Sequence, residues 1–445
     1  MYVKLIQPKM DMRPMDTEIK TRMSPPLGLY TIVSILRNDY KVIVQNENIE
    51  EIEYDTPDIV GITVSLDVLP AAIAIASRFR SHNVPVIAGG VHITTAYSTI
   101  PKDAFDAICI GPAEGTWPEI MSDLAKGTLK SVYRCTNSFS GKDIVSPAYD
   151  LIPKDKYLYS NIIYTSRGCP FKCDFCYNSF GEHRYVHREI DDVIAEIKAI
   201  GRKHIMIIDD NFIGNPKWTM ELLRAFIPLK IKWNAAVSIN VVNIPGMLDL
   251  MKDSGCQGLF IGFESINPSS IGGVHKVQND RTKYEYAIEE IHKRGFMING
   301  SFVFGLDDDT PEVFQKTLEW IVEQKIETIT SHILTPYPGT TLYDEFVKDN
   351  RLIDHDFSKY NTAHVVFQPK NMTPEQLYEG YLWIYKELYS FKNIYKRLPK
   401  AKKQWIPYLT FNLLYRKYGK WTDKMCKRFT YERIGWLAEK WSRYL

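Results

Sequence analysis

Short apolar runs alternate with helical patterns over most of this 445-residue chain, and they form two series. The first series predicts strands at residues 2–6, 41–45, 59–64, 84–88 and 107–110, with helices at 27–37 and 69–81. Such alternation is typical of a parallel sheet that carries helices on both faces. Ligands of these sheets bind at the carboxyl ends of the strands, which here are rich in glycine and polar residues.

The second series follows a connector at residues 131–160 that contains Gly141, Pro147 and Pro153. It predicts a helix at 191–200 and strands at 162–165, 205–208, 233–238, 259–263, 298–304 and 328–334. Barrels built from such units place their active sites at the carboxyl ends of the strands. Six units are too few to close an eight-stranded barrel, so we expect a partial one. Helices are expected after residue 350, notably at 374–390.

Three cysteines follow the first strand of the second series. Cys169, Cys173 and Cys176 have the spacing C-x3-C-x2-C. Thiolates at this spacing can bind three irons of a [4Fe–4S] cluster and leave the fourth iron open for chemistry. A zinc site is the alternative, and it would need a fourth ligand such as His183 or His187. The remaining cysteines are interpreted as buried apolar side chains, namely Cys109, Cys135, Cys256 and Cys426.

Composition favours a soluble cytoplasmic protein. Hydrophobic residues make up 45% and charged residues 24% of the chain, which is ordinary for a globular protein. No apolar stretch reaches the roughly 18–20 residues of a membrane span. The first eight residues do not have the pattern of a secretory signal. Seven cysteines, three of them clustered, fit a reducing compartment and a metal better than disulfides.

Charge is concentrated at the C-terminal end. Residues 391–445 hold 15 Lys+Arg and 3 Asp+Glu, a net charge of +12, and 13 aromatic residues. The other 390 residues carry a net charge of −10. Three interpretations stay open: a helical lid with a solvated basic face, an interfacial helix on anionic lipid, or a nucleic-acid surface.

The cysteine loop, from Thr165 to Tyr177, resembles that of the radical S-adenosylmethionine (SAM) superfamily. An aromatic residue, Phe175, precedes the third cysteine, and the strand-end motifs come in the expected order. The N-terminal half resembles the cobalamin-binding domain of one large class of these enzymes. That match is carried by residues 24–30 (SPPLGLY), 58–62 (DIVGI), 88–92 (AGGVH) and 110–114 (IGPAE). Residues 262–268 (GFESINP) and 335–340 (TPYPGT) resemble the branch of hopanoid C-2 methylases.

The resemblance implies an α/β fold with four parts. These are a Rossmann-like cobalamin-binding domain at 1–135, a linker at 136–155, a partial (β/α)6 barrel at 156–350 and a helical C-terminal region at 351–445. It also implies three cofactors: the [4Fe–4S] cluster, SAM and cobalamin. In this class the reduced cluster cleaves SAM to a 5′-deoxyadenosyl radical, which abstracts hydrogen from an unactivated carbon. Methylcobalamin then delivers a methyl group, and activity is oxygen-sensitive.

Site residues follow from the same resemblance. Those expected at SAM are Phe175, Asp209, Asp210, Ser238, Asn240, Glu264, Phe304, Pro336 and Tyr337. Those expected at cobalamin are Ser65, Leu66, Gly89, Gly90, Val91, His92, Gly111 and Glu114. No individual catalytic residue is assigned.

Several of these residues also have a purely structural interpretation. Asp209, Asp210 and Asn211 could bind the ammonium of SAM or cap a helix. Glu264 could be a buried structural carboxylate, and His92 a satisfied loop histidine. Ser238 and Asn240 could close a turn, and residues 336–338 could form a rigid turn rather than an adenine wall.

The chain departs from the family pattern at three places. Residues 8–26 lack the Asp-x-His-x-x-Gly loop that supplies an axial histidine in many cobalamin proteins. The usual Gly-Gly-Glu after the second barrel strand is Asp209-Asp210-Asn211, and the arginine often found on the third strand is Ser238.

The predicted function is a C-methyltransferase that acts on a lipid or hydrophobic natural product. One alternative is a radical oxidoreductase, cyclase or ring-rearranging enzyme, and another is a non-catalytic cobalamin- or redox-responsive protein. RNA methylthiotransferases carry three further upstream cysteines, whereas only Cys109 and Cys135 precede the loop here. Expected partners are a small-molecule or lipid substrate, a flavodoxin- or ferredoxin-type reductant, and the inner membrane surface through the tail. Nucleic acid is not expected.

Overall fold

The computed structural model describes residues 1–135, 139–179, 185–274, 276, 278–416 and 420–442. Within this part of the chain, the N-terminal sheet has six parallel strands in the order β2-β1-β3-β4-β5-β6. Its strands are β1 (Tyr2–Gln7), β2 (Lys41–Asn46), β3 (Ile59–Thr63), β4 (Val86–Gly89), β5 (Ala107–Ile110) and β6 (Val132–Arg134). This is the predicted Rossmann-like arrangement, with the change of winding direction between β1 and β3.

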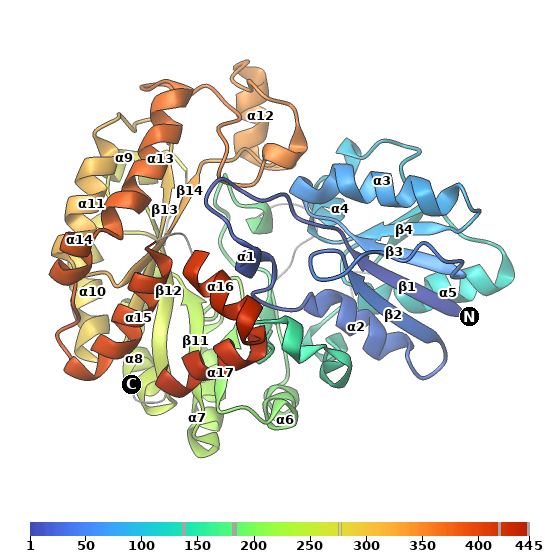
Figure 1. The fold of residues 1–445 in the computed structure, drawn as a ribbon, viewed down its shortest axis with the longest axis horizontal. Helices are drawn as coiled ribbons and strands as arrows, with labels where there is room; N and C mark the ends of the chain where they lie inside the picture. The colour runs from blue at the N-terminus through green and yellow to red at the C-terminus, as the bar shows by residue number, and fades with distance from the viewer. Residues whose placement is uncertain (136–138, 180–184, 275, 277, 417–419, 443–445) are drawn as a thin grey trace.

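Helices cover both faces of this sheet because its apolar residues point alternately to the two sides. The helices are α2 (Leu27–Leu36), α3 (Leu69–Arg80), α4 (Val91–Ala96) and α5 (Trp117–Lys126). Val3 and Leu5 of β1 pack in one core with α2 and α5. Ile6 packs in a second core with α3 and α4. The sheet is therefore doubly wound (Figure 1).

The second sheet has the order β14-β13-β12-β11-β10-β7, so neighbours in the chain are neighbours in space. Its strands are β7 (Ile162–Ile163), β10 (His204–Ile207), β11 (Lys232–Val237), β12 (Cys256–Glu264), β13 (Met297–Phe304) and β14 (Thr328–Ile333). Its helices are α6 (Ile190–Ile200), α7 (Pro216–Phe226), α8 (Met247–Asp253), α9 (Pro268–Gly272), α10 (Tyr284–Lys293), α11 (Val313–Glu323) and α12 (Thr341–Lys348). The edge strands β7 and β14 do not pair with each other, which confirms the predicted partial barrel.

The C-terminal region is helical, as predicted. Its helices are α13 (Pro374–Leu388), α14 (Phe391–Lys396), α15 (Trp405–Tyr415), α16 (Lys420–Arg428) and α17 (Tyr431–Ser442). Helix α13 is fixed to β14 because the hydroxyl of Tyr385 accepts a hydrogen bond from the backbone of Ser331 at 2.7 Å. The last two helices lie beside the short N-terminal helix α1 (Glu18–Thr21), near the middle of the molecule (Figure 1). Among the described helices, none has the length and apolarity to span a bilayer.

Several contacts among the described residues join the two halves of the molecule. The carboxylate of Glu114, beyond β5, forms an ion pair with Arg167 of the cysteine loop at 2.8 Å. Arg13 donates hydrogen bonds to the carbonyl of Asn361 and the hydroxyl of Thr362, both at 3.2 Å. The turn at Gly339 approaches α4 so closely that a Cβ there would lie 2.6 Å from the carbonyl oxygen of Thr95. The carboxyl edges of the two sheets therefore face each other.

Candidate active site

A cavity of about 290 Å³ lies where the two carboxyl edges meet. Four of the predicted cobalamin residues line it from the N-terminal sheet: Ser65, Leu66, Val91 and His92. Tyr337, predicted at SAM, lines it from the barrel, and so does Tyr177 of the cysteine loop. The fold thus brings residues from both predicted sites to one space.

The cysteine loop leaves the barrel after β7 and is closed at its base by a two-stranded ribbon. Strand β8 (Ser166–Arg167) pairs antiparallel with β9 (Val186–His187). Gly168 continues from β8 with φ +77°, a conformation that glycine adopts without strain. The loop therefore presents its thiols at the carboxyl end of the barrel.

All three thiols have raised pKa values because they are buried. Burial raises the pKa of Cys176 to about 12, and it raises those of Cys169 and Cys173 as well. Without bound iron the thiols therefore stay protonated at neutral pH, and a cationic metal is needed to stabilise the thiolates. A side-chain hydrogen bond from Asn211 to Cys169 and one from Gln278 to Cys173, at 3.5 Å, oppose this shift. Such donors to sulfur suit iron–sulfur ligands.

The zinc alternative finds little support in the described geometry. His183 lies outside the described residues. The ring of His187 stacks on Trp218 with centroids 4.7 Å apart. Within the described residues, no three His, Cys, Asp or Glu side chains converge on the position of a single metal ion. A cubane cluster does not require such convergence, because each thiolate binds a different iron.

Asp209 is fully used as a structural carboxylate. One oxygen accepts the backbone N–H of Thr165 at 2.7 Å, and the other accepts the hydroxyls of Thr165 and Ser166. Burial raises its pKa to about 6. Asp210 is exposed and accepts the backbone N–H of Gly168 at 3.1 Å. The alternative of a helix cap is wrong, since α7 is capped by Asn215.

The ends of β10 and β11 carry a polar chain that leads to the cysteine loop. The amide of Asn211 donates to the hydroxyl of Ser238 at 3.2 Å, and that hydroxyl contacts Asn240 at 2.6 Å. Because Asn211 also bonds Cys169, these side chains can orient both a cluster ligand and a polar group bound beside it. Ser238 and Asn240 thus lie in one network with Asn211.

Glu264 forms a buried ion pair with Lys276 and adopts an unusual backbone conformation, with φ +62°. Lys276 also donates to the carbonyl of Gly262 at 3.0 Å. This matches the interpretation of a buried structural carboxylate, although both charges influence the pKa of Cys173. Positive φ at a non-glycine residue stores strain that is common at functional sites. Sequence reasoning missed Lys276 because no motif marks it.

The aromatic candidates divide between the core and the cavity. Phe304 is buried and packs on Phe314 of α11 with ring centroids 4.7 Å apart, so it serves the core. Phe175 is partly buried against the same core. Tyr337 meets Tyr177 edge to face at 6.1 Å, and Pro336 is buried beside it. This tyrosine pair forms one wall of the cavity.

The cobalamin candidates lie at the carboxyl ends of β3, β4 and β5. A Cβ at Gly90 would lie 2.8 Å from the backbone nitrogen of Val64, and φ there is +104°. The backbone next to β3 occupies the space that a Cβ would need, so this position requires glycine. Gly89 has room for a Cβ, and the backbone N–H of Gly111 (φ +88°) donates a hydrogen bond to the hydroxyl of Thr94 at 3.1 Å.

His92 lies at the start of helix α4, and its ring lines the cavity. Its Nε2 forms a hydrogen bond with the hydroxyl of Thr99 at 3.1 Å. This matches the structural interpretation of His92 as a loop histidine whose ring is hydrogen-bonded within the protein. Burial lowers its pKa to about 4, which leaves the ring neutral at pH 7. Glu114, by contrast, is turned toward the barrel by its pair with Arg167.

Residues from distant segments complete the cavity. Arg13 and Lys20 come from the segment before α2, and Asn361 and Thr362 come from the region after α12. Arg13 is held by Asp16 at 2.7 Å while it bonds Thr362. No sequence signal links positions that lie 349 residues apart.

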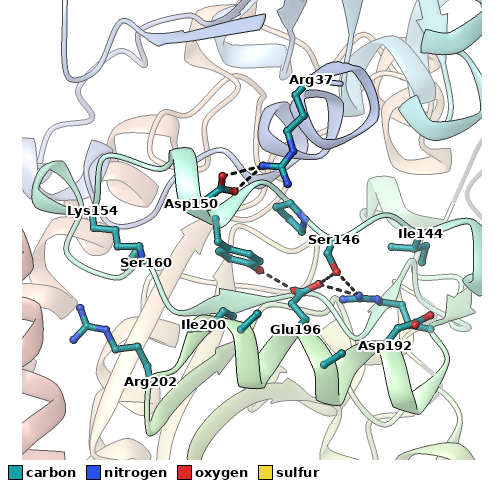
Figure 2. Close-up of a pocket in the computed structure, with 15 residues that line it drawn as sticks. Arg37, Ile144, Ser146, Asp150, Lys154, Ser160, Asp192, Glu196, Ile200 and Arg202 are labelled. Carbon is teal, nitrogen blue, oxygen red and sulfur yellow. Dashed lines mark hydrogen bonds and ion pairs between the residues drawn. The ribbon is translucent and has the colours of Figure 1, made fainter. Parts of the chain in front are cut away.

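A larger groove of about 630 Å³ lies outside this site, between α2, the linker and α6. Two ion pairs lie among its charged side chains: Arg37 with Asp150 and Arg188 with Glu196, both at 2.8 Å (Figure 2). Tyr149 donates a further bond to Glu196 at 2.8 Å. These contacts fasten the linker to the two sheets, and we assign the groove a structural role.

Comparison with known proteins identifies the chain. The radical SAM superfamily model matches residues 163–321, and a domain of unknown function (DUF4070) matches residues 340–413. Bacteriochlorophyllide d C-12(1)-methyltransferase of Chlorobaculum tepidum is 31% identical over 418 residues, or 91% of each chain. Hopanoid C-2 methylase of Rhodopseudomonas palustris is 25% identical over 76% of this chain and 67% of that protein. Anaerobic magnesium-protoporphyrin IX monomethyl ester cyclase of Rubrivivax gelatinosus is 23% identical over 82% of this chain and 72% of that protein.

Solved structures share the fold over nearly the whole chain. The radical SAM methyltransferase TsrM from Kitasatospora setae, with cobalamin and a [4Fe–4S] cluster bound, has a TM-score of 0.67, 14% identity and 99% coverage of both chains. The cobalamin-dependent radical SAM enzyme OxsB, with aqua-cobalamin bound, has a TM-score of 0.68 and 14% identity, covering 99% of this chain and 79% of that one.

Fold and site together define a cobalamin-dependent radical SAM enzyme. The chain belongs to the family of cobalamin-dependent radical SAM methyltransferases. Its cofactors are the [4Fe–4S] cluster, SAM and cobalamin, as the sequence predicted. The alternative of a non-catalytic protein is set aside.

Proposed function

We propose that the protein is a C-methyltransferase for an unactivated carbon of a lipid or hydrophobic natural product. The observation that carries this proposal is the shared cavity, lined by Leu66 and His92 from one sheet edge and by Tyr177 and Tyr337 from the other. Methyl transfer to a carbon radical needs both cofactors beside one substrate atom. A cavity bounded by both edges meets that requirement.

The loop cysteines Cys169, Cys173 and Cys176 bind three irons, and the Asn211–Ser238–Asn240 network holds the polar end of SAM. When bound, the cluster and SAM supply a carbon radical and cobalamin supplies the methyl group. Gly90 packs against the backbone of Val64 and so fixes the carboxyl end of β4 at the edge where the corrin binds. Neutral His92 presents an uncharged ring to the cavity, so it adds no charge beside the reacting carbon.

The barrel and the N-terminal sheet must stay together to exclude water from a radical. The Glu114–Arg167 pair and the tight approach of Gly339 to Thr95 hold the two edges in place. On the open side, Arg13 joins the N-terminal segment to Thr362. We propose that this side of the cavity, with Asn361 and Thr362, contacts the substrate.

The substrate class rests on the relatives. Their names specify a bacteriochlorophyllide and a hopanoid, which are both large hydrophobic ring compounds. We also propose an external reductant of flavodoxin or ferredoxin type, and a cytoplasmic location with peripheral contact to the inner membrane surface through the basic tail.

The test is anaerobic reconstitution with iron, sulfide and hydroxocobalamin, then incubation with SAM, a reductant and a bacteriochlorophyllide or a hopanoid, followed by mass spectrometry of the products. Methylated substrate with both 5′-deoxyadenosine and S-adenosylhomocysteine supports the proposal. S-adenosylhomocysteine is diagnostic because a second SAM must restore the transferred methyl group, and it loses its own methyl group in doing so.

A radical oxidoreductase or cyclase is the second candidate, and the similarity to the cyclase of Rubrivivax gelatinosus favours it. It predicts 5′-deoxyadenosine and a converted substrate without S-adenosylhomocysteine. The same experiment therefore separates the two candidates.

A further inference from the structure

Helix α15 presents its apolar side chains to solvent and buries polar ones. Its buried residues are Tyr408 and Asn412, whose side chains make hydrogen bonds inside the protein. Trp405, Ile406 and Leu413 are 38%, 65% and 45% exposed, respectively. A helix that covers a soluble protein has the opposite pattern. The outward face of α15 is therefore built for an apolar surrounding.

Helix α14 extends this face. Phe391 and Tyr395 are 62% and 75% exposed. The guanidinium of Arg416, just after α15, lies 3.9 Å from the ring of Phe391, and Tyr408 donates to the carbonyl of Ile394 at 2.7 Å. The two helices thus form a packed hairpin. They lie on the barrel, at the side away from the N-terminal sheet (Figure 1).

Basic side chains surround the apolar ones. Residues 391–422 contain nine Lys and Arg and no Asp or Glu. Those that are exposed in the structure include Lys392, Lys396, Lys400 and Lys402. The indole Nε1–H of Trp405 donates a hydrogen bond to the carbonyl of Pro399 at 2.8 Å, and this bond holds the ring at the surface. Tryptophan and lysine around aliphatic residues are characteristic of helices that lie in a membrane interface.

We propose that the α14–α15 hairpin is a docking surface for anionic lipid bilayers, with Ile406 and Leu413 entering the headgroup boundary and the lysines on lipid phosphates. Charge complementarity selects this partner. A second copy of the chain would bring two basic faces together. Nucleic acid would stack on aromatic rings but gives no role to the aliphatic side chains. The surface lies apart from the cavity, so this proposal does not depend on the proposed reaction.

The experiment is flotation of the reconstituted full chain, kept anaerobic, with vesicles of pure phosphatidylglycerol or pure phosphatidylcholine. We expect binding to phosphatidylglycerol that weakens as salt rises, and little binding to phosphatidylcholine. Each lysine near such a surface contributes about fivefold in affinity. The variant Lys392→Gln/Lys396→Gln/Lys402→Gln should therefore bind roughly 100-fold more weakly. Its matched control, Lys252→Gln/Lys316→Gln/Lys348→Gln, should bind like the natural protein.

The apolar contribution has its own pair of variants. Ile406→Ser/Leu413→Ser should lose at least about tenfold in vesicle affinity, whereas Val347→Ser/Ile353→Ser, at comparably exposed positions outside the hairpin, should not. Equal affinity for the two lipids would overturn the proposal. So would an equal loss of vesicle affinity in the hairpin variants and their control variants. Light scattering that shows a dimer which Ile406→Ser/Leu413→Ser abolishes would also overturn it. The same holds if the hairpin variants abolish DNA binding and leave vesicle binding unchanged. Circular dichroism checks that each variant is folded.

Discussion

At the scale of single residues, two carboxylates at the strand ends of the barrel are already bound within the protein. Asp209 uses both oxygens on Thr165 and Ser166, and Glu264 is paired with Lys276. Such residues set the positions of loops and strand ends rather than offering free groups to a ligand. The cavity itself is lined by aromatic and neutral side chains together with charged ones, among them Arg13 and Lys20.

Gly90 gives a direct test of the cobalamin edge. Gly90→Ala forces a Cβ to within 2.8 Å of the backbone of Val64 at φ +104°, so we expect a loss of about 2–3 kcal/mol in stability and weakened cobalamin binding. Gly28→Ala is the matched control, since a Cβ at this helical position meets no atom within 4 Å. It should be neutral or stabilising by up to about 1 kcal/mol. Urea unfolding measures the change in stability, and cobalamin absorbance measures the change in cofactor binding. Equal stability and equal cobalamin binding of the two variants would contradict the prediction.

His92 predicts a pH dependence. Its pKa falls from 6.5 to about 4 on folding because the ring is buried. The folded protein then binds fewer protons than the unfolded chain, so stability is complete above about pH 6.5 and declines as the pH falls toward 4. The full effect is about 3 kcal/mol. Because the pKa of His332 is also lowered to about 4, the comparison needed is natural protein against His92→Gln. Urea titrations of the cobalamin-free protein at a series of pH values give the unfolding free energy of each. As the pH falls, the free energy of the variant should decrease less steeply than that of the natural protein. Parallel curves for the two proteins would contradict the prediction.

At the scale of elements, the C-terminal helices are fixed by buried polar contacts. Arg397 is fully buried, and it donates to the carbonyls of Ile326 and Glu327 and to the side chain of Asn412. These bonds attach the tail to the loop before β14. A segment that looked like a separate basic piece in the sequence is therefore part of the barrel's wall.

Asn412 and its neighbour test this arrangement. Asn412→Leu leaves the buried guanidinium of Arg397 and the carbonyl of Glu327 short of a partner, so we expect a loss of about 2–4 kcal/mol in unfolding free energy. Leu413→Asn, one residue away and 45% exposed, should change it by no more than about 0.5 kcal/mol. Thermal unfolding of the two variants decides the point, and the reverse order of stability would show that the helix is oriented differently.

Elements with strong local patterns were predictable from sequence, and those that depend on distant partners were not. Strand β5 coincides with its predicted residues, Ala107–Ile110, because an unbroken apolar run marks a buried strand. Strand β6 was missed, since only Tyr133 of its three residues is buried and it lies in a connector. In the site, the cysteines are defined by spacing alone. Lys276, Arg13 and Thr362 could not be found, because their roles arise from contacts across the fold.

At the scale of the whole molecule, function depends on two sheets that meet at their carboxyl edges. The Glu114–Arg167 pair crosses this junction, with the carboxylate nearly buried and the guanidinium about a quarter exposed. A double-mutant cycle with Glu114→Gln and Arg167→Gln should give a coupling energy of about 1–2 kcal/mol in thermal unfolding. A coupling near zero would mean that the pair does not hold the sheets together.

The most direct measurement of the central claim is product analysis of the reconstituted enzyme and one cysteine variant. The natural protein, with SAM, cobalamin, reductant and a methylatable substrate under anaerobic conditions, should give 5′-deoxyadenosine and S-adenosylhomocysteine together. Cys173→Ala should lose the bound cluster and all deoxyadenosine, whereas Cys256→Ala, a buried cysteine of β12 outside the loop, should keep both. Deoxyadenosine from Cys173→Ala, or substrate turnover by the natural protein without S-adenosylhomocysteine, would contradict a cobalamin-dependent radical methyl transfer at this site.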